Sequence, residues 1–411
     1  MKSSVSKRAA IALLCAGASL VPAAVSAQRN AAPAVAYPNV SRAEYDALTA
    51  LEAALAARNY SAAAGALATA QSAARGSDAR FYLAGLQLRY ARESGNAPAL
   101  ASAVDALIAS GRLSGAQLAP LYVSQGAAAA GNGKREAAEA AYTRAFELAP
   151  TADTAIALAR IKLDRRKNAE AVALIDQAVQ LRRATGQPVP ESWLRRGASQ
   201  SMMSNLPAPA MSFSRQLVAA YPSPENWRDA VLTYRELAKP DAAGQLDAMR
   251  LLRLSRGLAG ERDYLEAAQT FDTAGLAAES RSVLDEGVNT RMVDPAKATF
   301  KEAIANAARK ATAEKAKLST LQASATAAAT GAPALQAGDV FLGAGNYAAA
   351  ADLFRAALQK GSVDPNVATT RLGTALALAG RKAEAEAAFR AVTGPRADLA
   401  ALWLVWLGQR A

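Results

Sequence analysis

A pattern of small and aromatic residues that occurs twice between Leu335 and Phe389 constrains this chain more than any other feature of its sequence. Its members return 35 positions later, from 338 to 373 for a glycine and from 354 to 389 for a phenylalanine. The remaining positions are Phe341, Gly345, Tyr347, Ala350 and Ala357, answered by Leu376, Gly380, Lys382, Ala385 and Val392. A period of this length is typical of helix pairs that stack on one another and share a core.

Local physical chemistry predicts where the two helices of each pair lie. Gly338 falls in the middle of a first helix, and Gly345 ends that helix where a left-handed conformation is needed. Residues 350–357 then belong to the second helix. Small side chains at positions 338, 350 and 357 let the two helices approach closely, while aromatic side chains fill the space around them.

The order of these positions resembles the tetratricopeptide repeat, as it occurs in exported bacterial proteins. The resemblance implies an all-α fold, an α-solenoid of stacked helix pairs with one long helix and a C-terminal capping helix. It also implies a groove, lined by the first helix of each pair, that holds a segment of a partner protein. Composition agrees with a largely helical chain, because alanine, leucine and arginine are abundant and aromatic residues make up only 6%.

The repeat pattern divides the chain into segments of unequal clarity. Residues 41–290 read as partly degenerate repeats that begin at a capping box formed by Ser41 and Glu44. The match is strongest at 117–150 in this half, and it blurs at 225–257. Residues 291–332 read as a long helix and linker, and 333–411 as two well-matched repeats with a capping helix at 399–409.

The long helix, expected over 295–329, has a thin apolar stripe with alanines between its members. A monomer is expected. A coiled coil that dimerises through this segment is the alternative, although Glu314 on its seam argues against that arrangement.

The amino-terminal residues 1–27 read as a secretory signal peptide. Basic residues precede an apolar run over 9–25, and Val25-Ser26-Ala27 supplies small residues for cleavage. An uncleaved membrane anchor is the alternative, weakened by the Gly, Ser and Pro inside the run. Residues 28–40 are expected to be a disordered leader. Cleavage near Ala27 would place the mature protein in the periplasm and remove Cys15, the only cysteine of the chain.

Several kinds of chemistry are missing from this composition. The chain has no histidine, which removes the usual general base and metal ligand, and no glycine-rich phosphate loop is present. We therefore expect no enzyme activity, no cofactor and no metal. A hydrolase built on two carboxylates remains an alternative. We expect the acids of the repeats to lie on solvated helix faces, among them Glu136, Glu139, Asp176, Glu384 and Glu386.

An excess of basic residues between 160 and 196 suggests where a partner binds. This stretch contains nine lysines and arginines but only four acids. The net charge of the whole chain, +12, falls to +9 when the three basic residues of 1–27 are removed. We expect Arg160, Arg195 and Arg196 to form one edge of a basic lane that recruits an acidic protein, with Trp227 as a flat anchor. A solvated charged face without a ligand is the alternative.

Three functions follow from these expectations. The first is a non-catalytic scaffold of the periplasm or cell envelope that mediates protein–protein interaction. The second is an accessory subunit held by its basic charge to a membrane surface or to envelope polysaccharide, with nucleic acid not expected as a ligand. The third is a histidine-independent hydrolase of cell-wall glycans.

Overall fold

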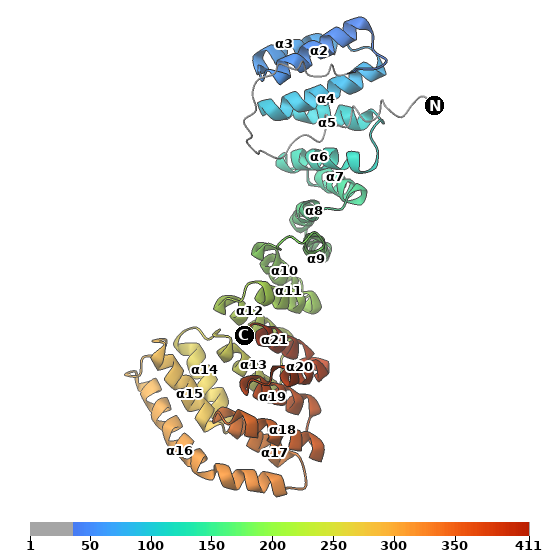
Figure 1. The fold of residues 1–411 in the computed structure, drawn as a ribbon. Helices are drawn as coiled ribbons and strands as arrows, with labels where there is room; N and C mark the ends of the chain where they lie inside the picture. The colour runs from blue at the N-terminus through green and yellow to red at the C-terminus, as the bar shows by residue number, and fades with distance from the viewer. Residues whose placement is uncertain (1–35, 411) are drawn as a thin grey trace, which may run out of the picture. The chain divides into compact units, whose positions relative to one another are not determined.

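The computed structural model describes residues 36–410, so the expected signal peptide and residues 28–35 of the leader lie outside the described part. Within 36–410 every regular element is a helix and no β-strand occurs, which confirms the all-α solenoid (Figure 1). None of the helices over these residues is both long and apolar enough to span a membrane.

The chain forms two compact units that meet between Gly186 and Gln187. In unit 1, consecutive helices pack as four pairs. Its helices are α2 (Arg42–Ala56), α3 (Tyr60–Ala73), α4 (Ser77–Ser94), α5 (Ala97–Ala109), α6 (Ala119–Gly131), α7 (Arg135–Leu148), α8 (Ala152–Asp164) and α9 (Asn168–Ala184), with the short 3-10 helix η1 (Gly115–Gln117) before α6.

Unit 2 contains the remaining pairs, the long helix and the capping helix. Its helices are α10 (Glu191–Met203), α11 (Pro207–Ala220), α12 (Pro224–Ala238), α13 (Ala242–Leu254), α14 (Gly260–Thr273), α15 (Ala277–Asn289), α16 (Ala298–Ala327), α17 (Ala332–Gly343), α18 (Tyr347–Lys360), α19 (Pro365–Leu378), α20 (Lys382–Ala391) and α21 (Ala397–Gly408), with the 3-10 helix η2 (Gly394–Arg396) before α21.

A contact between a glycine and an aromatic ring holds four of the pairs together. A Cβ atom added to Gly338 would lie 2.6 Å from the Phe354 ring, and one added to Gly373 would lie 2.7 Å from the Phe389 ring. The same arrangement recurs between Gly126 and Tyr142 and between Gly197 and Phe213. In each of these four pairs the two residues are 16 positions apart, so the same spacing produces the same helix contact.

Local signals place the helix ends as the sequence predicts. Ser41 and Glu44 form the capping box at the start of α2. Gly345 and Gly380 follow α17 and α19 with φ angles of 81° and 78°, values that glycine adopts without strain. Where other pairs turn through a non-glycine residue, as at Arg166 with φ of 60°, the backbone keeps the same left-handed turn.

The expectation that the leader is disordered up to residue 40 is wrong at Tyr37. This side chain is only 6% exposed because its ring packs against the rings of Tyr45 and Tyr82. Tyr37 therefore belongs to the core of unit 1, and Val40 packs against that core.

Helix α16 is continuous and packs within its own chain, against α15 and α17. Glu314 is half-buried and accepts hydrogen bonds from the backbone N–H groups of Ala277 and Ala278, which caps α15. Lys360 donates hydrogen bonds to the carbonyl oxygens of Ala325, Thr326 and Ala328 at the C-terminal end of α16. Glu314, the charged residue on the seam of α16, is thus a capping residue of α15.

Helix α13 lies at the centre of unit 2 (Figure 1), and its middle turns are buried on every side. All residues from Leu246 to Leu252 are buried, which is more than one face of a helix can supply. This explains why the repeat pattern blurs over 225–257: the second helix of that pair leaves the outer layer and fills the interior of the unit.

Six buried charged side chains, here called the central cluster, join α13 to its surroundings. They are Asp247, Arg250, Glu279, Asp339, Arg371 and Arg396. Arg250 donates to Glu279 and Asp339, at 2.8 and 3.0 Å. Asp247 accepts from Arg371 at 3.0 Å and from Arg396 at 2.7 Å. Three cations face three anions, so the cluster is electrically balanced inside the unit.

Helix α21 caps the repeat array, as expected, and also packs against α11 and α12, which closes unit 2 on itself. Gln409 donates to the carbonyl oxygen of Val218 and accepts from the indole N–H of Trp227. The indole N–H of Trp406 donates to the carbonyl oxygen of Leu254 at the end of α13.

Candidate functional site

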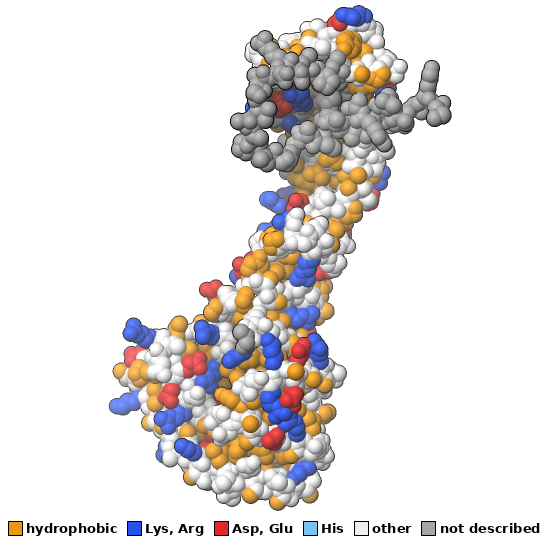
Figure 2. All heavy atoms as spheres, viewed as in Figure 1, with side chains coloured by type: hydrophobic (Ala, Val, Ile, Leu, Met, Phe, Trp, Pro, Cys, Tyr) orange, Lys and Arg blue, Asp and Glu red, His pale blue; other side chains and the backbone are white. Residues whose placement is uncertain are grey.

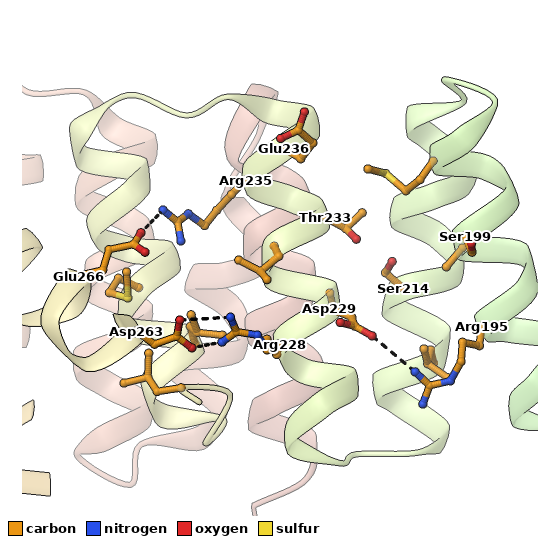
Figure 3. Close-up of a pocket in the computed structure, with 18 of the residues that line it drawn as sticks. Arg195, Ser199, Ser214, Arg228, Asp229, Thr233, Arg235, Glu236, Asp263 and Glu266 are labelled. Carbon is orange, nitrogen blue, oxygen red and sulfur yellow. Dashed lines mark hydrogen bonds and ion pairs between the residues drawn. The ribbon is translucent and has the colours of Figure 1, made fainter. Parts of the chain in front are cut away.

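A groove of about 910 Å³ in unit 2 is the candidate site. It runs across α10, α12 and α14, and residues of α11 and α13 form part of its floor (Figure 3). These three helices are the first helices of consecutive pairs, which is where the sequence places a partner. Elsewhere in the unit, α13 and the central cluster occupy the space beside α17 and α19.

Ion pairs bridge neighbouring helices along the groove (Figure 3). Arg228 of α12 donates to both carboxylate oxygens of Asp263 of α14, and Arg235 donates to Glu266 of α14 at 2.5 Å. On the other side of α12, a guanidinium nitrogen of Arg195 of α10 is 3.5 Å from a carboxylate oxygen of Asp229. These pairs fix the separation of the three helices and leave their charges at the groove surface.

The groove as a whole carries no net charge. Four arginines and four carboxylates line it: Arg195, Arg228, Arg235, Arg262, Asp229, Glu236, Asp263 and Glu266. Apolar side chains lie among them, including Met202 and Met203, and Met203 is 67% exposed. Methionine side chains adapt to differently shaped surfaces. The arrangement suits a polypeptide segment with both charged and apolar side chains better than a purely acidic one.

The structure places one of the four predicted partner-binding residues in the groove. Arg195 lines the groove, whereas its neighbour Arg196 is exposed outside it. Arg160 is exposed on α8, in unit 1. Trp227 is 3% exposed and bonded to Gln409, so the expectation that it is a flat surface anchor is wrong. Its place on the inner side of α12 makes it a core residue.

The basic stretch 160–196 is neutralised in part by acids from the preceding pair. Lys162, Lys167 and Arg165 all bind the carboxylate of Glu139. Burial opposes ionisation of this carboxyl, but the three hydrogen bonds outweigh it and lower the pKa of Glu139 to about 2. Glu139 is buried, so its expected place on a solvated face is wrong. Charges across the drawn face of the molecule are likewise of mixed sign (Figure 2).

Sequence reasoning missed Arg228, Arg235, Asp263 and Glu266, although a signal for Arg228 and Asp263 exists. Arg228 and Asp263 are 35 residues apart, and Arg195 and Asp229 are 34 apart. Opposite charges separated by one repeat period face each other on adjacent first helices, so a search for such pairs would have identified the groove.

The described part of the chain offers no group of three or more acidic, histidine or cysteine side chains placed to hold a metal ion. The groove carboxylates are each engaged by an arginine or separated along α12. This arrangement can bind and orient a polypeptide through hydrogen bonds and salt bridges.

Comparisons with known proteins give a family match and matches to solved structures. Residues 119–151, which contain α6 and α7, match the tetratricopeptide repeat family. Among solved structures, the TPR2AB domain of yeast Sti1 in its complex with pHSP90 is 13% identical, with a TM-score of 0.25, over 71% of this chain and 99% of that one. Naa15/Naa10 bound to HypK-THB is 11% identical, with a TM-score of 0.31, over 78% of this chain and 63% of that one.

A search of curated proteins finds no match. The family match coincides with the pair at 117–150, which the sequence singles out as the clearest of its half. The described part of the chain is an all-α solenoid of helix pairs, in which residues 119–151 match the tetratricopeptide repeat.

Proposed function

We propose that this protein is a non-catalytic scaffold that binds a segment of a partner protein in the groove across α10, α12 and α14. The observation that carries the proposal is the groove itself: it crosses the first helices of three consecutive pairs and is open, while α13 fills the space beside α17 and α19. A volume of about 910 Å³ accommodates several side chains of a bound polypeptide.

We further propose that the scaffold works in the periplasm or cell envelope after removal of residues 1–27. Support comes from Lys2, Lys7 and Arg8 ahead of the apolar run, and from the small residues before Gln28. The intact mass of the protein purified from cells tests this part. A mass that begins near Gln28 is expected, and a retained amino terminus would refute it.

Two adjacent arginines provide a matched test of the groove. Arg195 and Arg196 are both exposed on α10, and only Arg195 lines the groove. The full chain is used to capture partners from envelope extracts, and affinity is then measured for Arg195→Glu and Arg196→Glu. The charge reversal at Arg195 puts a third carboxylate beside those of Glu191 and Asp229. It should weaken binding of the captured partner on the order of tenfold.

The control variant Arg196→Glu should bind the captured partner with the affinity of the parent. Equal affinity of the parent and both variants, at low salt, would place the partner outside this groove. Equal losses in both variants would indicate a diffuse attraction to the charge of α10 and would also refute the assignment.

A further inference from the structure

A second surface, in unit 1, is already occupied by the chain itself. Residues 36–40 precede α2 and contain a turn at Pro38-Asn39, where Asn39 has a φ of 65°. Tyr37 from this segment inserts between α2 and α4, the first helices of two consecutive pairs. The space between these two helices is thus filled by a side chain from a short non-helical segment.

The contacts of this segment are those of a bound ligand. The Tyr37 hydroxyl donates to Glu52 of α2 at 2.8 Å. Its ring lies 6.0 Å from that of Tyr45 on α2 and 5.2 Å from that of Tyr82 on α4, in edge and tilted orientations that aromatic pairs favour. The acceptor and the two aromatic walls come from the repeat helices, and the inserted side chain comes from outside them.

The start of α2 does not need this insertion. Ser41 and Glu44 form a complete capping box, and Glu44 also accepts from the backbone N–H groups of Arg75 and Gly76. The capping contacts at the start of the helix are therefore made by residues that follow Val40. The burial of Tyr37 is an interaction separate from this cap, and α2 and α4 also pack directly against each other.

We propose that residues 36–40 are an intramolecular ligand of the surface formed by Tyr45, Glu52 and Tyr82, and that this surface also binds partner segments that present a tyrosine before a Pro-Asn turn. This surface is specific for tyrosine, because the rings of Tyr45 and Tyr82 pack against the inserted ring and the carboxylate of Glu52 accepts a hydrogen bond from its hydroxyl. The attached segment is at a high effective concentration and so excludes such partners until it is displaced.

The test uses an acetylated and amidated peptide of sequence AYPNVS, which copies residues 36–41, and the full chain carrying Tyr37→Ala. The variant should bind the peptide at least tenfold more tightly than the parent, because its own segment no longer competes. A peptide with Phe in place of Tyr should bind on the order of tenfold more weakly, since it lacks the hydroxyl that donates to a charged acceptor.

Glu52→Gln, combined with Tyr37→Ala, should reduce the preference for the Tyr peptide over the Phe peptide. Circular dichroism establishes whether each variant is folded. If Tyr37→Ala does not fold, Tyr37→Phe, which keeps the ring, replaces it in the binding measurements. With Tyr37→Phe the Tyr peptide should still bind more tightly than it binds the parent. No binding to a folded variant, or equal binding to parent and variant, would show that Tyr37 is only a core residue and would overturn the proposal.

Discussion

Removal of one carboxylate from the central cluster should destabilise unit 2 as a whole. Asp247 is 2% exposed and accepts from Arg371 and Arg396, and its carboxylate lies 3.7 Å from the Arg250 guanidinium. In Asp247→Ala, three buried arginines keep the buried carboxylates of Glu279 and Asp339, and Arg396 also keeps the exposed carboxylate of Asp241. In the intact cluster, the attraction between opposite charges offsets the cost of removing them from water. Without Asp247 that attraction no longer offsets the cost for the arginines.

The expected cost follows from the burial of these groups. Breaking a buried pair by removing one partner costs about 3–5 kcal/mol, because the remaining charge is left uncompensated. For a unit of this size, each kcal/mol lowers Tm by about 2–4 °C, so the predicted decrease is about 6–20 °C. Asp247→Asn, which keeps the volume and removes the charge, should shift Tm in the same direction.

Tryptophan fluorescence is suited to this measurement, because all four tryptophans, at 193, 227, 403 and 406, belong to unit 2. The matched control is Asp352→Ala, which removes a carboxylate paired only with Arg355 and 74% exposed. That change should cost less than about 1 kcal/mol. If Asp247→Ala melts within about 2 °C of the parent, the central cluster does not hold unit 2 together.

Three other predictions concern single positions. Gly373→Ala should lower the free energy of unfolding by about 1–3 kcal/mol, because its Cβ would meet the Phe389 ring. Gly85→Ala, whose Cβ would have no atom in reach, should raise the free energy of unfolding by about 0.5–1 kcal/mol. Changes in Tm of opposite sign in thermal melts check both. Arg166→Gly should stabilise unit 1 by about 1 kcal/mol in urea titrations, since it relieves a left-handed residue; an unchanged midpoint would contradict this. Glu139, with a pKa of about 2 in place of the ordinary 4.5, contributes stability above about pH 4.5 that is lost as the pH falls towards 2, so Glu139→Gln should flatten the acid unfolding curve followed by circular dichroism.

The repeat pattern predicted most of the fold because each close contact leaves a residue signature. Gly338 and Gly373 are small since an aromatic ring lies against each of them, and the 35-residue period repeats that contact. The capping box at Ser41 is equally local. Features of this kind depend on neighbours within one helix pair, and a single sequence displays them directly.

Contacts between distant helices were not predictable in this way. Asp247 and Arg250 resemble a solvated face in sequence, because nothing local shows that their partners come from α15, α17 and α19. Trp227 was assigned to the surface for the same reason, since its partner Gln409 is 182 residues away. Only Arg195 of the predicted binding residues lines the groove, because net charge along the chain does not show which charges are already paired.

The burial of α13 also determines when unit 2 can fold. A linear repeat array adds its pairs one after another, because each pair contacts only its neighbours. Here Asp247 finds one counter-ion, Arg396, 149 residues later in the chain. At ribosomal rates of about 5–20 residues per second, roughly 7–30 s pass between the synthesis of the two. The core of unit 2 can therefore be completed only after the segment that carries Arg396 has been made.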